Sequence, residues 1–179
     1  MPSEIIIGVS GGIAAYKTAA LVSSLVQLGH GVSVVMTPSA HQFIGAATFE
    51  ALTGRRVPQG TFDTLHHPLG PHISLADGAH LLCIAPATAN VLAKMAHGLA
   101  DDLLSTLVLS FGGPVVLAPA MNTEMWAKPA VQRNVQTLAA DGVHIVPPDE
   151  GWLSCRKTGP GRMADPNAIQ NAIEEILNL

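Results

Sequence analysis

The sequence predicts a doubly wound α/β fold with a mostly parallel sheet, and two observations support that prediction. Short runs of branched apolar residues recur along the chain, each bounded by glycine or proline, and stretches with helical periodicity separate them. Because these runs are apolar on both faces, they suit strands that helices cover on both sides. The expected strands are residues 4–9, 31–36, 79–86, 113–119 and 142–148.

Helical patterns follow most of these strands. The last begins at Pro166, and proline is common at the first position of a helix. One long irregular connection, residues 53–71, is rich in glycine, proline, histidine and threonine. The alternation predicts a three-layer sandwich of the flavodoxin-like or Rossmann-like kind, with residues 1–179 forming a single domain. The expected helices are residues 13–28, 88–98, 101–111, 129–140 and 166–177.

Composition narrows the classes of function. Of 179 residues, 48% are hydrophobic and only 12% are charged, with a formal net charge of −4, so no nucleic-acid partner is expected. So few charges favour an oligomer whose subunits cover part of the surface, although a large internal core would explain them equally well. Two cysteines cannot form a disulfide framework, the first residues do not resemble a signal peptide, and no apolar run is long enough to span a membrane. We therefore expect a cytoplasmic protein.

The loop after the first expected strand, GVSGGIAAYK (residues 8–17), favours phosphate binding. Glycines between a strand and a helix let the backbone approach a phosphate, which the free N–H groups of the helix then hold; a tight turn made only for packing is the alternative. The dinucleotide fingerprint G-x-G-x-x-G is absent, which argues against NAD. Residues 8–12 match the G-x-S-x-G of a hydrolase elbow, which would need later strands to supply the acid and the histidine. The hydroxyls of Ser10, Thr37 and Ser39 suit a mononucleotide phosphate better.

Polar residues also follow the third and fourth expected strands. PATAN (residues 86–90) and PAMNTEMW (residues 119–126) each begin with a proline that ends a strand, and HISL (residues 72–75) precedes the third strand. The carboxyl ends of neighbouring parallel strands meet at one edge of a sheet. We therefore expect the polar residues just beyond Pro86 and Pro119 to converge on one crevice if those two strands are neighbours.

Five motifs, SGGIAAYK, HISL, PATAN, PAMNTEMW and LSCRKTGPGRM, resemble in this order those of the homo-oligomeric flavin-containing cysteine decarboxylases, most closely the phosphopantothenoylcysteine decarboxylases. The resemblance covers residues 4–166 and implies a single flavoprotein decarboxylase domain with FMN as cofactor. It implies oxidative decarboxylation of a cysteine carboxylate in coenzyme A biosynthesis, with 4′-phosphopantothenoylcysteine as the small-molecule substrate and 4′-phosphopantetheine as the product. It also implies a homotrimer or homododecamer.

The resemblance also assigns residues. His72 would be the base that acts on the substrate thiol, Asn122 would hold the departing carboxylate, and Cys155 would be the proton donor on a loop that closes over the substrate. Cations of that loop would meet the substrate's phosphate. The implied substrate-binding residues are Asn122, Arg156, Lys157, Arg162 and Met163. The implied FMN-binding residues are Ser10, Gly11, Ala14, Thr37, Ser39, Phe43, Thr88, Asn90, Ala118 and Met121.

Several alternatives stay open. Many phosphopantothenoylcysteine decarboxylases carry a glycine directly after the loop cysteine, where this chain has Arg156, and the same motifs serve peptidyl-cysteine decarboxylases and non-catalytic regulatory flavoproteins that bind a phosphatase. Met121 and Trp126 would otherwise be core residues, and Asn90 a helix cap. Cys83, in an apolar strand, is expected to be an inert core thiol. No metal is expected, because His66, His67, His80, His97 and His144 show no metal-ligand spacing shared with cysteines or carboxylates.

Overall fold

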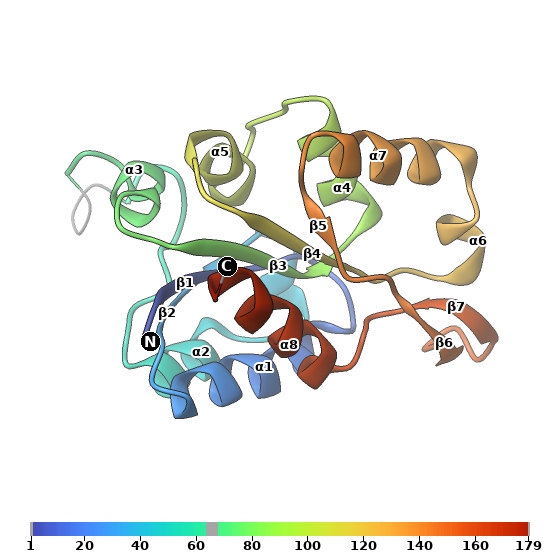
Figure 1. Ribbon diagram of the computed structural model, residues 1–179, viewed down its shortest axis with the longest axis horizontal. Helices are drawn as coiled ribbons and strands as arrows, with labels where there is room; N and C mark the ends of the chain where they lie inside the picture. The colour runs from blue at the N-terminus through green and yellow to red at the C-terminus, as the bar shows by residue number, and fades with distance from the viewer. Residues whose placement is uncertain (1, 64–67, 179) are drawn as a thin grey trace.

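A five-stranded parallel sheet forms the centre of the protein (Figure 1). The computed structural model describes residues 2–63 and 68–178. The strands are β1 (Glu4–Val9), β2 (Gly31–Met36), β3 (Leu81–Ala87), β4 (Val115–Pro119) and β5 (His144–Ile145). They follow the order β2-β1-β3-β4-β5 across the sheet, and every neighbouring pair is parallel. The doubly wound, mostly parallel fold predicted from the sequence is therefore confirmed.

The strand order creates a switch point in the sheet. From β1 the chain goes to β2 on one side, whereas β3 and the later strands add on the other side. Ligands of such sheets bind where the order reverses, beyond the carboxyl ends of the strands. Those ends are Val9, which pairs with Met36 of β2, and Ala87, which pairs with Pro119 of β4. The loops that follow these four residues are thus the place to look for a site.

Helices cover both faces of the sheet in separate layers (Figure 1). One face carries α1 (Ala15–Gln27), α2 (Ala46–Thr53) and α8 (Pro166–Leu177), and the other carries α3 (Pro71–Ala76), α4 (Ala89–Ala96), α5 (Leu103–Ser110) and α7 (Pro129–Ala140). Alternate side chains of β1 enter the two cores, since Ile5 and Ile7 pack with the first layer and Ile6 with the second. Among the described residues, no helix is both long and apolar enough to cross a membrane.

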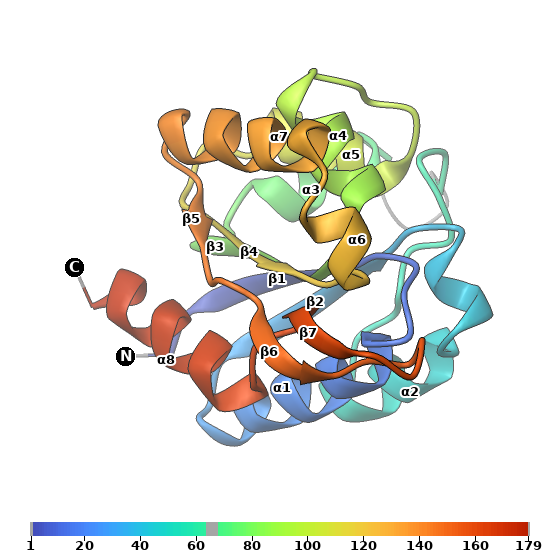
Figure 2. The same cartoon turned by 90° about the vertical axis from the view of Figure 1, so that its right-hand side faces the viewer.

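A β-hairpin stands apart from the main sheet. Its strands β6 (Asp149–Trp152) and β7 (Thr158–Arg162) are antiparallel, and the hairpin lies beside the short helix α6 (Thr123–Trp126), facing the viewer in Figure 2. No strands were predicted for these residues. The reason is that the inward positions of β7 are Gly159 and Gly161, so the alternation of buried and exposed residues carries no hydrophobic signal.

Several other elements differ from the expectation. β3 and β4 begin later than predicted, at Leu81 and Val115, and β5 is much shorter than predicted. Neither α2 nor α3 was predicted. The pattern of α2 is weak because Phe49 is its buried residue and it lacks an apolar stripe. The HISL motif, which contains His72, lies within the short helix α3, packed against α5.

Candidate active site

A cavity of about 960 Å³ opens at the carboxyl edge of the sheet. Its walls include residues 10–14 after β1, 37–39 after β2, 88–91 after β3, 120–122 after β4, and 152–155 of the hairpin. Because four of these segments follow strands of one sheet, the sheet sets their mutual positions. The residues implied for cofactor, substrate or catalysis that line the cavity are Ser10, Gly11, Ala14, Thr37, Ser39, Thr88, Asn90, Met121, Asn122, Cys155, Arg162 and Met163.

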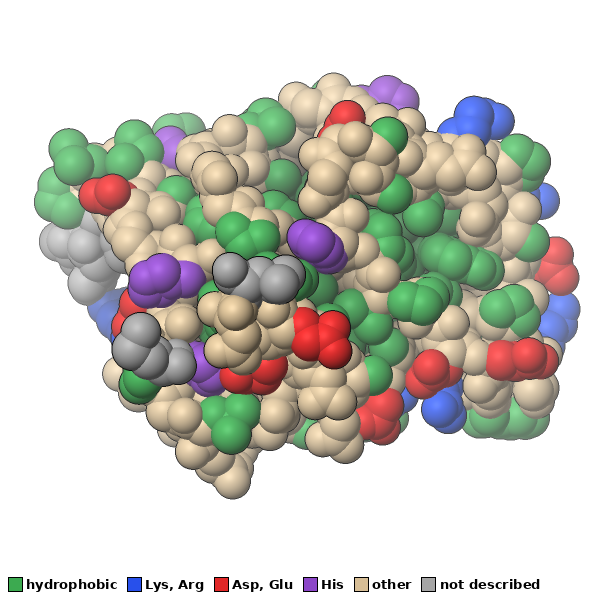
Figure 3. Space-filling model, viewed as in Figure 1, with side chains coloured by type: hydrophobic (Ala, Val, Ile, Leu, Met, Phe, Trp, Pro, Cys, Tyr) green, Lys and Arg blue, Asp and Glu red, His purple; other side chains and the backbone are tan. Residues whose placement is uncertain are grey.

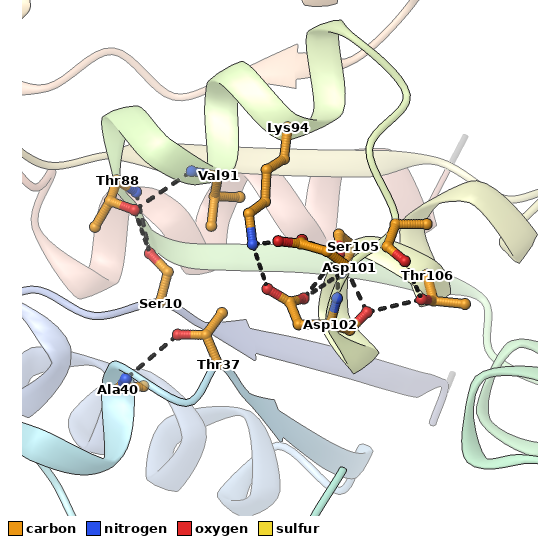
Figure 4. Close-up of polar contacts among 11 residues, drawn as sticks. Ser10, Thr37, Ala40, Thr88, Val91, Lys94, Asp101, Asp102, Ser105 and Thr106 are labelled. Carbon is orange, nitrogen blue, oxygen red and sulfur yellow. Dashed lines mark hydrogen bonds and ion pairs between the residues drawn. The ribbon is translucent and has the colours of Figure 1, made fainter. Parts of the chain in front are cut away.

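Ser10 and Thr88 fasten β1 to β3 at the cavity wall (Figure 4). The Ser10 hydroxyl donates a hydrogen bond to the Pro86 carbonyl (2.6 Å) and accepts one from the Thr88 N–H (3.1 Å), and the residue is only 1% exposed. Thr88 is also the N-cap of α4, where its hydroxyl accepts a hydrogen bond from the Val91 N–H (3.5 Å). The alternative that Asn90 serves as the helix cap is therefore wrong, and Asn90 lines the cavity instead.

These contacts of Ser10 argue against the hydrolase alternative. A serine nucleophile is activated by a hydrogen bond to a catalytic base, usually a histidine. The Ser10 hydroxyl instead bonds to Pro86 and Thr88. Ser10 therefore acts as a link between two strands and not as a nucleophile.

The N-terminus of α1 opens into the cavity. Its cap residue, Ala14, offers no side-chain acceptor to the first turn, and that turn, which the structure describes in full, contains no acidic residue. Glycine is needed at Gly11, because an added Cβ would collide with Ser39 of the neighbouring loop. Lys17 also lines the cavity. Backbone N–H groups, the positive end of the helix dipole and the Lys17 ammonium together favour an anion.

The loop after β2 adds hydroxyl groups to the same wall. Thr37 is 6% exposed and its hydroxyl accepts a hydrogen bond from the Ala40 N–H (3.3 Å), which fixes the turn that presents Ser39. Two residues implied for FMN lie elsewhere in the described chain: Phe43 is half exposed and Ala118 is buried in β4, and neither lines the cavity. Their roles stay predictions.

A charged cluster forms the α4–α5 side of the cavity (Figure 4). Lys94 Nζ lies 2.6 Å from Asp101 Oδ1 and 2.7 Å from Asp102 Oδ2, and Asp102 also caps α5 by accepting a hydrogen bond from the Ser105 N–H (2.8 Å). Burial acts to lower the pKa of Lys94, but the two carboxylates outweigh it, and this pKa lies above its usual value. Burial acts to raise the pKa of Asp102, but hydrogen bonds from Lys94 and Ser105 hold it below its usual value. Lys94 and Asp102 are therefore both charged at neutral pH.

The hairpin docks on the loop after β4 through its backbone. The Met121 N–H donates a hydrogen bond to the Gly161 carbonyl (2.9 Å). An added Cβ at Gly159 would lie 2.6 Å from Thr123 Oγ1, and one at Gly161 would collide with the Met121 carbonyl. Gly161 also has a φ of +122°, which side chains rarely adopt. Gly159 and Gly161 are therefore needed for the hairpin to pack closely against the loop after β4.

Asn122 is placed beside that contact with its amide group partly free. As the N-cap of α6, its Oδ1 accepts a hydrogen bond from the Met125 N–H (2.8 Å). The Nδ2 donors are left for a ligand in the cavity that Asn122 lines. Met121 and Trp126 pack against the core, as the alternative reading held, and Met121 lines the cavity as well.

The two cysteines have opposite environments. Cys83 is fully buried in β3 and burial raises the pKa of its thiol to about 12, so the expected inert core thiol is confirmed. Cys155 is exposed at the tip of the hairpin and lines the cavity. The next residue, Arg156, donates its N–H to the Leu153 carbonyl (2.9 Å) and has a φ of +63°, a conformation that favours glycine. Within the described chain, Arg156 and Lys157 are not among the lining residues.

His72 lies far from Cys155. The helix that carries it, α3, stands at the opposite end of the molecule's long axis from the hairpin (Figure 1). In the part of the chain that the structure describes, His72 does not line the cavity, and its buried Nδ1 has no hydrogen-bond partner. Its ring packs closely over Gly70, where an added Cβ would lie 3.0 Å from His72 Cε1. A single chain therefore does not bring His72 together with Asn122 and Cys155.

Sequence reasoning missed part of the cavity wall. Lys94, Asp101 and Asp102 received no role, because their meeting depends on how α4 packs on α5. Two signals were available. The first is that Lys94 follows Asn90 by one helical turn, so the two residues share a face of the helix. The second is that Asp102 precedes Ser105 by three residues, a spacing typical of the start of a helix.

Two of the histidines expected not to bind metal, His66 and His67, lie outside the described residues. Within residues 2–63 and 68–178, no group of three or more histidine, cysteine, aspartate or glutamate side chains is arranged to hold a metal ion.

The chain matches the Flavoprotein family over residues 2–178. It is 46% identical over 172 residues to the coenzyme A biosynthesis bifunctional protein CoaBC of Bacillus subtilis (strain 168), a match that covers 96% of this chain and 42% of that protein. The CoaBC protein of Vibrio parahaemolyticus is 43% identical over 173 residues, with 97% of this chain and 43% of that protein covered. The chain thus spans less than half the length of these curated relatives.

Solved structures agree with this assignment. The FMN-dependent cysteine decarboxylase SpaF has a TM-score of 0.86 and 38% identity, covering 98% of this chain and 95% of that one. A cysteine-to-serine mutant of a PPC decarboxylase, complexed with pantothenoylaminoethenethiol, has a TM-score of 0.87 and 29% identity, with both chains covered completely. As the resemblance of its motifs to flavin-containing cysteine decarboxylases predicted, this chain belongs to the Flavoprotein family.

Proposed function

We propose that this protein catalyses the FMN-dependent oxidative decarboxylation of a cysteine carboxylate, converting 4′-phosphopantothenoylcysteine to 4′-phosphopantetheine in coenzyme A biosynthesis. The observation that carries the proposal is that one cavity joins the open N-terminus of α1, the amide of Asn122 and the thiol of Cys155. The names of the CoaBC relatives and of the PPC decarboxylase structure support it. Both cysteines are free, which suits a reducing compartment, and we place the reaction in the cytoplasm.

The residues present in the cavity fit a flavin mononucleotide. The first turn of α1, with Gly11 beside it, would hold the phosphate, and Thr37 and Ser39 add hydroxyl groups. Asn90 and Met121 offer an amide and an apolar surface to the ring. When bound, FMN supplies hydride acceptance, which converts the substrate thiol to a thioaldehyde and so creates an electron sink beside the bond that breaks.

Asn122 would hold the substrate carboxylate. Its Oδ1 is engaged in the cap of α6, so its Nδ2 donors would be the groups that bind a carboxylate oxygen in the cavity that Asn122 lines. A cation at this position would stabilise the carboxylate more than the neutral carbon dioxide that leaves. A neutral amide orients the group without raising that barrier.

Cys155 would supply the proton that completes the product. Decarboxylation leaves an enethiol, and adding to it a proton and the hydride that the flavin would return gives the saturated aminoethylthiol. The hairpin that carries Cys155 is a separate two-stranded sheet whose backbone docks on Met121 through Gly161, so it is suited to close over a bound substrate.

The cations of the hairpin would meet the substrate's phosphate. Arg156 and Lys157 lie at its tip, and Arg162 lines the cavity at the end of β7. Arg162 lies 3.7 Å from Asp149, an exposed pair of the kind that contributes little to stability, so its guanidinium is available for a stronger partner. Guanidinium groups bind phosphate through paired hydrogen bonds. Buried Met163 would shape the floor beneath them.

His72 would reach the cavity from a second subunit. Hydrophobic side chains gather over the α3 end of the molecule (Figure 3), where Leu69, Ile73 and Leu109 are 76%, 45% and 56% exposed. Covering them between subunits would stabilise an assembly. We place α3 of one subunit against the cavity of the next, in a homotrimer or a homododecamer built from trimers. An active monomer of 18.5 kDa in light scattering would contradict this arrangement.

A second candidate substrate is a peptide that ends in cysteine. The observation that favours it is the apolar rim of the cavity, where Tyr16 and Trp152 are 62% and 64% exposed and would contact peptide side chains. The substrate would then lose carbon dioxide by the same chemistry, without a phosphate for Arg156 and Lys157.

A two-part experiment tests the proposal. The purified protein is expected to be yellow and to release FMN when heated; a colourless protein that takes up no FMN would contradict it. The holoenzyme is then incubated with 4′-phosphopantothenoylcysteine or with a cysteine-terminated peptide, and the masses of the products are measured by mass spectrometry. Loss of carbon dioxide from the phosphorylated substrate alone supports the first candidate, whereas loss from the peptide alone supports the second.

A further inference from the structure

We propose that the cluster of Lys94, Asp101 and Asp102 tunes the reduction potential of the flavin, with the Lys94 ammonium favouring the reduced state and the Asp101 carboxylate opposing it. The inference rests on the proposed function, since it needs a flavin in the cavity. It gives a task to three charged residues of the cavity wall that the proposed chemistry leaves unused.

The first support is position. Asn90 and Lys94 are separated by one helical turn of α4, so they share a face of that helix, and both line the cavity. Thr88, which caps the same helix, is hydrogen bonded to Ser10 at the proposed flavin wall. Figure 4 shows the Lys94 side chain extending from α4 toward Asp102. The ammonium therefore lies along the same wall as the groups proposed to hold the cofactor.

The second support is that the charges are fixed and partly removed from water. The side chains of Lys94 and Asp102 are 15% and 12% exposed. Asp102 is held on its other side by the N–H and the hydroxyl of Ser105, at 2.8 and 2.9 Å. A charge in such a wall acts over a longer distance than the same charge in water. Asp101 is different, because its side chain is 66% exposed and can be neutralised with little disturbance.

The third support is the sign of each charge. Reduction of a flavin adds negative charge to its ring, and fixed charges near the ring change how easily that occurs. Lys94 would therefore ease reduction, and each carboxylate would oppose it. A purely structural link between α4 and α5 makes a different prediction, because loosening it from either side would change the potential in the same direction or leave it unchanged.

The experiment compares the midpoint potential of the FMN-loaded protein in matched variants, measured against a reference dye. In Lys94→Met we expect the equilibrium constant for reduction to fall about tenfold, which for a two-electron couple is about 30 mV toward negative potential. Asp101→Asn should shift the potential in the opposite direction, and Lys94→Arg should keep the wild-type value. Lys128→Met and Asp141→Asn repeat the two charge changes at exposed positions outside the cavity wall and should leave the potential unchanged.

Opposite shifts in Lys94→Met and Asp101→Asn support the inference. Shifts of the same sign, or equal potentials in all variants, overturn it while leaving the proposed function intact. A protein that binds no flavin contradicts both. If Lys94→Met does not fold, Asp101→Asn and Asp101→Lys decide, because both break the ion pair with Lys94 and differ only in charge. A positive shift that is larger in Asp101→Lys supports the inference, whereas equal shifts, a negative shift or an unchanged potential overturn it.

Discussion

The wall of the cavity at β1 and β3 and the wall formed by the β6–β7 hairpin are held in different ways. The first is fixed by hydrogen bonds between buried groups, with Ser10 bonded to Pro86 and Thr88. The second is a separate two-stranded sheet with an exposed tip, docked through Gly159 and Gly161. The difference fits the proposed roles of the two walls, in which the rigid wall would hold the cofactor and the hairpin would enclose the substrate.

The largest expected loss of activity comes from substituting His72, which lies on neither wall. His72→Asn should lower the decarboxylation rate by about 10²–10⁴-fold, the range typical of a general base, while FMN stays bound. Steady-state rates and the flavin content of the purified variant check this. Because His72 and Asn122 would serve the site from different subunits, co-assembling His72→Asn with Asn122→Ala should restore part of the activity. Near-normal turnover by His72→Asn alone would remove the residue from the mechanism.

Gly161→Ala should loosen the hairpin and spare the rigid wall. The added Cβ meets the Met121 carbonyl at a residue with a φ of +122°, and we expect docking to weaken by about 1–3 kcal/mol. Faster proteolysis of the hairpin and a higher KM, with unchanged FMN affinity, are the measurements. Gly142→Ala is the control, since it has a φ of +88° with open space around its Cβ. Equal effects in the two variants would show that backbone strain, and not the contact with Met121, is responsible.

Thr88→Val should affect the rigid wall and spare the hairpin. It removes the cap of α4 and a partner of Ser10, so we expect a loss of stability of about 1 kcal/mol and an FMN affinity about fivefold lower. Chemical denaturation and fluorescence titration with FMN check these two values. Thr137→Val, on the exposed face of α7, is the control. Wild-type FMN affinity in Thr88→Val would separate this wall from the cofactor.

Arg156→Gly should have the smallest effect on stability, and the effect should be favourable. Glycine adopts a φ of +63° without the strain that arginine carries, so we expect a gain of about 1 kcal/mol or less. The same change removes a proposed phosphate contact. The KM should therefore rise for 4′-phosphopantothenoylcysteine and not for the unphosphorylated compound, and an equal change for both substrates would contradict that contact.

The sequence predicted the rigid wall better than the hairpin, for a physical reason. Apolar runs that end in Pro86 and Pro119 mark buried strands, and parallel strands necessarily gather their carboxyl ends at one edge. The strands of the hairpin were not predicted, because glycines occupy the inward positions of β7. The separation of His72 from Cys155 was not predicted either, because it depends on tertiary structure that no local pattern encodes. The ion pairs of Lys94 likewise depend on packing between two helices.

Whether one wall holds FMN while the hairpin delivers a thiol proton can be tested in a single anaerobic turnover. The protein is mixed with 4′-phosphopantothenoylcysteine while the flavin absorbance is recorded, and the mass of the product is then measured by mass spectrometry. For the natural protein we predict that the absorbance falls and recovers and that the product is the saturated aminoethylthiol. For Cys155→Ser we predict that the absorbance falls and stays low, with an enethiol product lighter by two hydrogen atoms. Recovery of the absorbance and a saturated product in Cys155→Ser would show that the Cys155 thiol is not the proton donor.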